Sequence, residues 1–273
     1  RLTLPVRATT KEAVGRRPPP KSSRHGRNGM SETITIARPA PHVALVEMSN
    51  PPSNALSDAV RGALASALEA LEADLDLRAV VLTGAGAMFC AGDDLREVAT
   101  LNHRMKERLA DFARLFARIE NFRVPVIAAI DGPAMGGGLE LALCCDIRLA
   151  APGARFAAAG VNVGLMASVR RLPRLIGTAR AKAMLLTGRP IDAETALAYG
   201  LVTELHPAET LRAAALDLAR HIATRAPLSV EAAKRHAGLA FDLTAAEAEA
   251  AQDADLDRLL ASADHHAAVA AFL

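Results

Sequence analysis

Short apolar runs recur along the chain after residue 33, separated by longer segments of mixed polarity. The runs at 43–48, 79–83 and 124–130 hold few polar residues, a pattern typical of strands buried on both faces of a sheet. Between them, apolar residues recur every three or four positions at 60–71, which is the period of an amphipathic helix. The alternation of these two patterns predicts an α/β domain.

Several predicted helices also carry recognisable ends. Ser57 precedes the first amphipathic segment, and Asp192 precedes a short one that stops at Gly200. Both polar side chains are therefore predicted N-caps, and the glycine is a predicted C-cap. Residues 104–120 form a second, charged amphipathic segment, and the chain from 211 onward is alanine-rich and helical in pattern.

Three segments are predicted: a basic leader at 1–29, an α/β core at 30–205 and a helical region at 206–273. The leader holds eight Lys or Arg residues and one acid without an apolar period, so it is predicted to be disordered. Its composition resembles an organelle transit peptide, which implies a mitochondrial protein. The alternative is sequence upstream of a start at Met30. The arginine-rich and alanine-rich composition favours this alternative and a bacterial cytoplasmic protein.

Composition excludes several classes of function. The net charge is +2 and aromatic residues make up 3% of the chain, with no Trp, so nucleic-acid binding is not expected. No apolar run is long enough to span a bilayer without a charge or a glycine cluster. Three cysteines provide neither a disulfide framework nor metal-ligand spacing, so no metal site is predicted.

The most informative segment spans residues 124–151. Its apolar run stops at an Asp-Gly-Pro turn and restarts as a helix behind Gly136, Gly137 and Gly138, with Glu140 in the first helical turn. Glycine lets a backbone approach a ligand closely, and the first amides of a helix lack intrahelical partners. The segment therefore predicts a corner that binds an anion or oxyanion, with a carboxylate beside it for proton transfer.

A second glycine-bearing loop, Phe89-Cys90-Ala91-Gly92-Asp93-Asp94-Leu95, strengthens this interpretation. Together with the corner at 136–140, it resembles the crotonase superfamily, the enoyl-CoA hydratase and isomerase proteins. Further matches in the same order are the segments 50–56, 145–148, 171–177, 186–188 and 200–202. The resemblance runs from about residue 33 to the last residue.

The resemblance implies a fold, a substrate class and an assembly. The fold is an α/β crotonase-like spiral of ββα units, followed by helices that pack subunits into a homotrimer or a dimer of trimers. The substrate is an acyl-CoA thioester, whose carbonyl oxygen lies between the backbone N–H groups of Asp93 and Gly137. Coenzyme A is then part of the substrate, and Glu140 matches a catalytic carboxylate. The residues expected to line the substrate are Ser53, Ala55, Leu56, Ala91, Gly92, Asp94, Leu95, Gly136, Gly160 and Asn162.

One departure from the family pattern affects the expected chemistry. Hydratases of this family use a second carboxylate 20 residues after the first, and this chain has Gly160 there. Residues 147–191 contain no Asp or Glu, so a shifted alignment does not restore the acid. Loss of a general acid or base typically costs about 10² to 10⁴ in rate, so efficient two-carboxylate hydration is not expected.

Three interpretations remain open. Glu140 alone could support slower hydration or double-bond isomerisation; another polar group such as Asn162 could serve a different acyl-CoA reaction; or the chain could bind acyl-CoA without turnover. Leu165, Met166 and Val169 are expected to make the acyl pocket apolar. The Cys144-Cys145 pair is interpreted as core packing, and Asp94 as a helix cap.

Overall fold

In this computed structural model, residues 33–100 and 104–273 are described. The leader predicted at 1–29 lies outside this range. The described strands form a six-stranded sheet in the order β1-β2-β3-β4-β6-β9 and a three-stranded sheet in the order β5-β7-β8. The large sheet consists of β1 (Ile34–Ala40), β2 (Val43–Met48), β3 (Ala79–Gly84), β4 (Val126–Ile130), β6 (Ile147–Ala150) and β9 (Glu204–Leu205). The small sheet consists of β5 (Pro133–Met135), β7 (Arg155–Ala157) and β8 (Ile191–Asp192).

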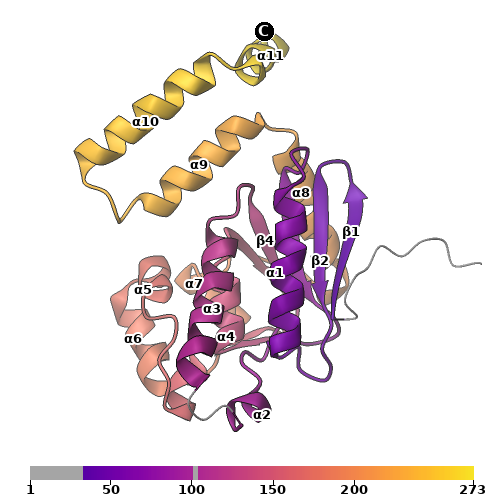
Figure 1. Ribbon diagram of the computed structural model, residues 1–273, viewed down its shortest axis with the longest axis vertical. Helices are drawn as coiled ribbons and strands as arrows, with labels where there is room; N and C mark the ends of the chain where they lie inside the picture. Colours follow the sequence, from indigo (N-terminus) through magenta and orange to yellow (C-terminus); the bar gives the residue numbers. More distant parts are fainter. Residues whose placement is uncertain (1–32, 101–103) are drawn as a thin grey trace, which may run out of the picture.

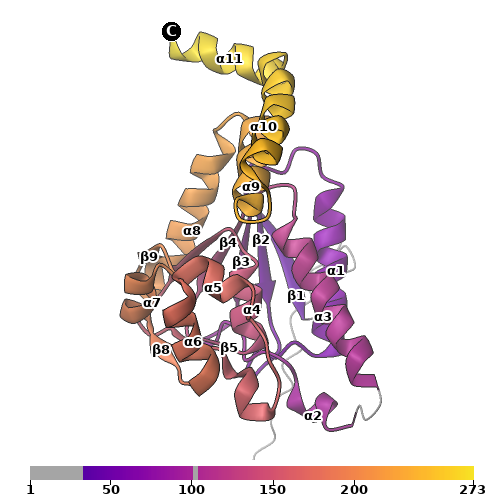
Figure 2. The ribbon, with the colours of Figure 1, turned by 90° about the vertical axis from the view of Figure 1, so that its left-hand side faces the viewer.

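Helices cover both faces of the large sheet, which confirms the predicted α/β class (Figures 1 and 2). Its strands from β2 to β9 run parallel, and β1 pairs with β2 antiparallel. Successive side chains of a strand point to opposite faces, so Val80 and Leu82 join one apolar cluster while Val81 joins the other. The uninterrupted apolar runs in the sequence reflect this burial on both sides.

The first cluster is covered by α1 (Asp58–Glu72) and α3 (Met105–Glu120), and the second by α8 (Ala208–Ala223). Ser57 caps α1 by accepting a hydrogen bond from the amide of Val60, and Asp192 caps the short helix α7 (Ala193–Tyr199), which ends at Gly200. These three predicted helix ends are confirmed. The remaining helices are α2 (Leu95–Val98), α4 (Gly137–Leu143), α5 (Arg171–Ile176), α6 (Thr178–Thr187), α9 (Pro227–Leu239), α10 (Ala245–Leu260) and α11 (Ala263–Phe272).

The C-terminal helices differ in how they contact the core. Helix α8 packs on the large sheet. Helix α9 contacts the segment just before β4 through Lys234, whose Nζ donates to the carbonyl of Val124 at 3.0 Å. Helices α10 and α11 extend beyond the body of the molecule (Figure 1), and α10 has no buried residue. The division at 205/206 and the oligomeric role of the C-terminal region remain predictions.

Among the described residues, no helix combines the length and the apolar character that crossing a membrane requires.

Candidate active site

The two glycine-bearing turns follow adjacent parallel strands. Strand β3 leads into the loop at 85–94, and β4 leads into the turn before α4. Carboxyl ends of parallel neighbours meet at one edge of a sheet, so both turns emerge at the same place. A short pairing continues between them: the amide of Cys90 donates to the carbonyl of Pro133 at 3.1 Å, and the amide of Met135 donates to the carbonyl of Cys90 at 2.9 Å.

The amides of Asp93 and Gly137 lie close together in this arrangement. A Cβ built on Gly137 would be 3.4 Å from the nitrogen of Asp93, and one built on Gly92 would be 2.7 Å from the nitrogen of Gly137. Gly92 also has a φ of +94°, so a side chain there would be strained as well as obstructed. Neither amide donates a hydrogen bond to another group in the described part of the chain. Both donors are thus available to one ligand atom.

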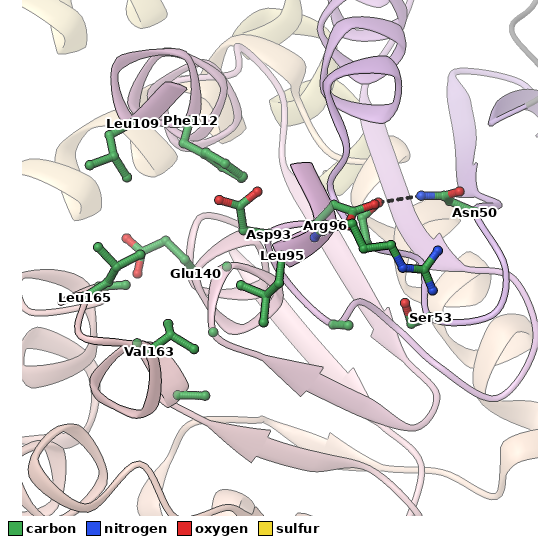
Figure 3. Close-up of a pocket in the computed structure, with 18 of the residues that line it drawn as sticks. Asn50, Ser53, Asp93, Leu95, Arg96, Leu109, Phe112, Glu140, Val163 and Leu165 are labelled. Carbon is green, nitrogen blue, oxygen red and sulfur yellow. Dashed lines mark hydrogen bonds between the residues drawn. The ribbon is translucent and has the colours of Figure 1, made fainter. Parts of the chain in front are cut away.

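Glu140 lies in the first turn of α4, beside these amides. It is 7% exposed, and its side chain lines the same pocket as Asp93 and Gly137 (Figure 3). Its Oε1 accepts from Arg171, while its buried Oε2 has no partner among the described residues. A buried carboxylate oxygen without a partner is costly, which is typical of a group that acts on a ligand.

Arg171, at the start of α5, holds Glu140 in place. One arm of its guanidinium binds Glu140, and the other binds Glu120 Oε2 at 2.6 Å. Burial lowers the pKa of Arg171, but neighbouring groups, including Cys144, Glu120 and Glu140, outweigh this effect and raise the pKa above its ordinary value. Arg171 therefore remains a cation and orients Glu140 permanently.

The pocket has a volume of about 440 Å³ and two chemically distinct ends (Figure 3). Ser53 and Arg96 lie at one end, and Leu109, Phe112 and Leu165 at the other, toward which the side chain of Glu140 points. The complete lining is Asn50, Pro51, Pro52, Ser53, Ala55, Ala91, Asp93, Asp94, Leu95, Arg96, Leu109, Phe112, Phe116, Gly136, Gly137, Glu140, Ala159, Gly160, Val163, Leu165, Met166 and Ala167. Such a pocket suits a ligand with a polar portion and an apolar portion.

Most of the residues assigned to the site from the sequence line this pocket. They are Ser53, Ala55, Ala91, Asp93, Asp94, Leu95, Gly136, Gly137, Glu140 and Gly160. Gly92, Leu56 and Asn162 are outside the lining. Leu56 is fully buried and its amide donates to the carbonyl of Gly92 at 2.7 Å, so it supports the turn from behind. Asn162 is exposed, and its side-chain amide donates to the carbonyl of Gly188 at 3.4 Å. Its orientation gives no support to a role in the pocket.

At Gly160, the position of the missing acid, neighbouring backbone fills the space that a side chain would need. Gly160 lies in the 3-10 helix Ala159–Val163, and its carbonyl accepts from the amide of Leu165 at 2.9 Å. A Cβ on Gly160 would be 2.8 Å from the carbonyl oxygen of Leu165. Of the residues expected to form the apolar wall, Leu165 and Met166 line the pocket, whereas Val169 does not. The chain here folds tightly and leaves no space for a larger residue.

Sequence reasoning missed the residues that α3 and α5 bring to the site. Leu109 and Phe112 had been placed on an amphipathic helix with no link to the pocket, and Arg171 belonged to a matched motif without an assigned contact. Arg148, in the segment 147–191 that contains no acid, is buried and donates to the carbonyl of Leu201 at 2.7 Å.

Three thiols lie in or next to the elements that form the site. Cys90, Cys144 and Cys145 are all buried, in agreement with the predicted core packing of the last two. Burial raises the pKa of Cys90 and of Cys145 to about 12, so both are unreactive thiols at neutral pH. Asp94 caps α2 by accepting from the amide of Arg96 at 2.9 Å, as predicted.

Comparisons with known proteins identify the family of this chain. The sequence model of the enoyl-CoA hydratase/isomerase family matches residues 39–273. The chain is 36% identical over 255 residues to 2,3-dehydroadipyl-CoA hydratase of Escherichia coli strain K12, covering 89% of this chain and 96% of that protein. It is 42% identical over 166 residues to a probable enoyl-CoA hydratase of Bacillus subtilis, covering 59% of this chain and 64% of that protein.

A crystal structure of enoyl-CoA hydratase from Bacillus anthracis has the same fold. It superposes with a TM-score of 0.86 at 32% sequence identity, covering 88% of this chain and 96% of that one. The family match spans both glycine-bearing turns, the helix that carries Glu140 and the C-terminal helices. This protein belongs to the enoyl-CoA hydratase/isomerase family.

Proposed function

We propose that this protein is an enzyme that shifts the double bond of enoyl-CoA thioesters, with Glu140 as its only acid–base carboxylate. The observation that carries the proposal concerns the Oε2 of Glu140, which has no partner within the part of the chain that the structure describes. This atom is buried in a pocket that also contains the amides of Asp93 and Gly137. The two amides bind the thioester oxygen, where negative charge develops as the enolate forms. Each such donor typically contributes about 2.7 to 4 kcal/mol to the transition state.

One carboxylate is sufficient for this reaction. Glu140 removes a proton from the α carbon of a 3-enoyl thioester, and the electrons move into a dienolate on the thioester oxygen. The protonated Glu140 then returns the proton to the γ carbon, which leaves a 2-enoyl thioester and the original carboxylate. Arg171 holds the other carboxylate oxygen throughout.

Hydration is the second candidate, and the printed names of the relatives favour it. In this reaction Glu140 activates a water molecule for addition to the double bond. Gly160 provides no second carboxylate to position that water, and the adjoining wall contains Val163, Leu165 and Met166. We therefore expect hydration to be the slower of the two reactions.

The two ends of the pocket support the orientation of the substrate. Arg96 and Ser53 lie at the polar end, where the phosphates of coenzyme A would enter, and Leu109 and Phe112 surround the acyl group. We expect an apolar acyl chain to be preferred over acetyl. Equal binding of acetyl-CoA and an eight-carbon enoyl-CoA would contradict this assignment. A trimer or dimer of trimers remains the expected assembly.

Steady-state assays of crotonyl-CoA hydration and 3-hexenoyl-CoA isomerisation test the proposal, with Glu140→Ala as the negative control. Isomerisation faster than hydration, and loss of both in Glu140→Ala, would support it. Turnover that survives in Glu140→Ala would contradict the role of the carboxylate. Micromolar binding of both thioesters without turnover by either protein would instead identify a binding protein.

A further inference from the structure

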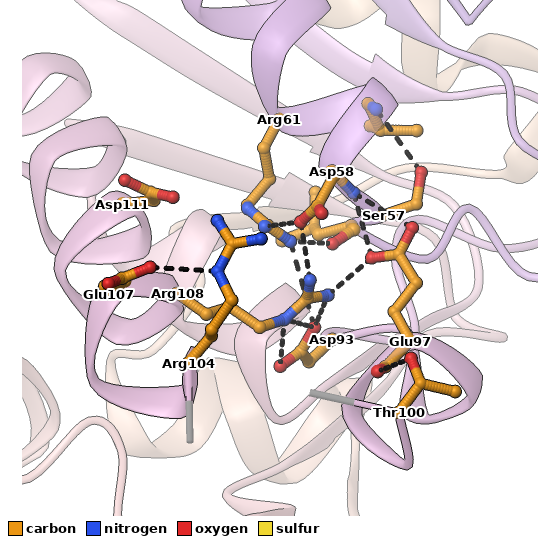
Figure 4. Close-up of polar contacts among 12 residues, drawn as sticks. Ser57, Asp58, Arg61, Asp93, Glu97, Thr100, Arg104, Glu107, Arg108 and Asp111 are labelled. Carbon is orange, nitrogen blue, oxygen red and sulfur yellow. Dashed lines mark hydrogen bonds and ion pairs between the residues drawn. The ribbon is translucent and has the colours of Figure 1, made fainter. Parts of the chain in front are cut away.

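An ionic cluster lies directly behind the oxyanion turn and is separate from Glu140 (Figure 4). Its centre is Arg108 of α3, which is 3% exposed. The Nε of Arg108 donates to both carboxylate oxygens of Asp93, at 2.9 and 3.1 Å, and a second nitrogen binds Asp93 as well. The same guanidinium binds Asp58 at 2.6 Å and Glu97 at 2.8 Å. The buried guanidinium of Arg108 thus binds mainly the side chain of Asp93, whose amide is the proposed oxyanion donor.

A carboxylate at this position creates an electrostatic difficulty. Asp93 supplies an amide to a developing negative charge, yet its own side chain is also negative and lines the pocket. Like charges a few ångströms apart in a low-dielectric site repel each other strongly. Burial lowers the pKa of Arg108, but hydrogen bonds and charge from Asp93 and Glu97 outweigh this and raise the pKa above its ordinary value. Its cation therefore persists and compensates the carboxylate.

The cluster also fixes the direction of the Asp93 amide. In a trans peptide the C=O and N–H groups point in opposite directions. The carbonyl of Gly92 accepts from the amide of Leu56 at 2.7 Å, so the amide of Asp93, in the same peptide group, points away from Leu56. Arg61 donates to the carbonyl of Leu56 at 2.7 Å, and its cation lies 4.4 Å from the ring centre of Phe112. Arg61 thus holds Leu56, whose amide binds the carbonyl of this peptide, and Arg108 holds the side chain of Asp93.

We propose that Arg108 is a positioning residue for catalysis: it neutralises and anchors the Asp93 carboxylate so that the Asp93 amide serves as an oxyanion donor. The inference rests on the proposed function, because it assumes that a thioester oxygen binds at this amide. Arg108 does not line the pocket, and its contact with the oxyanion turn is the one to Asp93. A purely structural ion pair would affect folding without altering the polarisation of the bound carbonyl.

The first experiment compares the wild type with Arg108→Met, using Arg114→Met as the control. Arg114 lies on the same helix, and its side chain is 73% exposed. Misplacing one oxyanion donor is expected to lower kcat of the Arg108→Met variant about tenfold to a hundredfold with little change in KM. The control is expected to retain wild-type kcat. An unchanged kcat in the Arg108→Met variant would overturn the inference.

The second experiment asks whether the effect passes through Asp93. The double variant Asp93→Ala/Arg108→Met keeps the backbone amide but removes the uncompensated carboxylate. Its kcat is expected to exceed that of Arg108→Met about fivefold to tenfold. A double variant no faster than the single one would overturn the inference. If Arg108→Met does not fold, Arg108→Lys takes its place, because lysine keeps the charge but loses the two-armed contact.

The third experiment measures the infrared carbonyl stretch of bound hexanoyl-CoA, which has no double bond to react. A shift to lower wavenumber in the wild type, with a smaller shift in Arg108→Met and partial recovery in the double variant, would support the inference. A wild type without a shift would contradict the proposed oxyanion site itself. If the shift is as large in Arg108→Met as in the wild type, the role of Arg108 is overturned, but the proposed oxyanion site is not.

Discussion

Two of the carboxylates that line the pocket, Glu140 and Asp93, are each bound by an arginine, but the arginines leave them in different states. Arg171 binds one oxygen of Glu140, and the other oxygen is buried without a partner among the described residues. Arg108 binds both oxygens of Asp93. An oxygen that already accepts hydrogen bonds from a guanidinium is a poor proton acceptor. We therefore infer that the contacts of a carboxylate, rather than its presence in the pocket, decide whether it can transfer protons.

The largest expected effect comes from removing the proton acceptor itself. Glu140→Gln keeps the shape of the side chain but cannot take a proton, so kcat is expected to fall about 10² to 10⁴-fold. Asp93→Asn keeps the backbone amide and is expected to lower kcat by about tenfold or less, far below the effect of removing a general base. Steady-state kinetics with 3-hexenoyl-CoA measures both. Equal losses in the two variants would show that the carboxylates are not functionally different.

A newly introduced carboxylate tests whether the missing acid can simply be added. Gly160→Glu forces a Cβ to within 2.8 Å of the Leu165 carbonyl, so the loop must shift, with an expected loss of about 1 to 3 kcal/mol in unfolding free energy. Crotonyl-CoA hydration is not expected to increase. Urea unfolding measures the loss, with Gly153→Glu as the exposed control, where a Cβ meets nothing within 4 Å. A faster hydratase of unchanged stability would contradict this prediction.

The contact between Arg171 and Glu140 can be weakened without removing either charge. Arg171→Lys keeps the cation but cannot bind Glu140 and Glu120 with two arms, so the orientation of Glu140 loosens. We expect kcat to fall about tenfold with KM nearly constant. Arg174→Lys, on the same helix but bound to Asp242, is the control. A normal kcat in Arg171→Lys would show that Glu140 is held by other contacts.

The smallest effect concerns the thiol that lies between the two turns. Burial raises the pKa of Cys90 to about 12 from 9.0, so the unfolded chain loses this proton at lower pH than the folded protein. Stability is therefore full below pH 9 and falls as the pH rises toward 12. Between pH 8 and pH 10, Cys90 alone is expected to contribute a loss of about 1.4 kcal/mol.

Comparing wild type and Cys90→Ala in urea unfolding at several pH values isolates this contribution. The variant is expected to show the shallower alkaline decline, whatever its stability at pH 8. Identical declines would show that Cys90 is accessible to solvent or ionises normally. The result also defines the pH above which lost activity reflects unfolding rather than the chemistry of Glu140.

The amino-acid sequence by itself determined the α/β class, the two glycine-bearing turns and the placement of Glu140 after the second turn. These features are local: the apolar runs predict strands, and glycines before a helix predict free amides. The replacement of the second acid by Gly160 was equally visible, because it needs only the spacing from Glu140.

The tertiary structure alone decided which side chains reach those turns. Arg171 is 31 residues from Glu140 and Arg108 is 15 from Asp93, and each contact depends on how a helix packs against the sheet. Leu56 and Asn162 were assigned to the pocket from the sequence, yet one supports the turn from behind and the other is exposed. Helix packing depends on many distant apolar contacts at once, so no local pattern specifies which charged side chains it brings together.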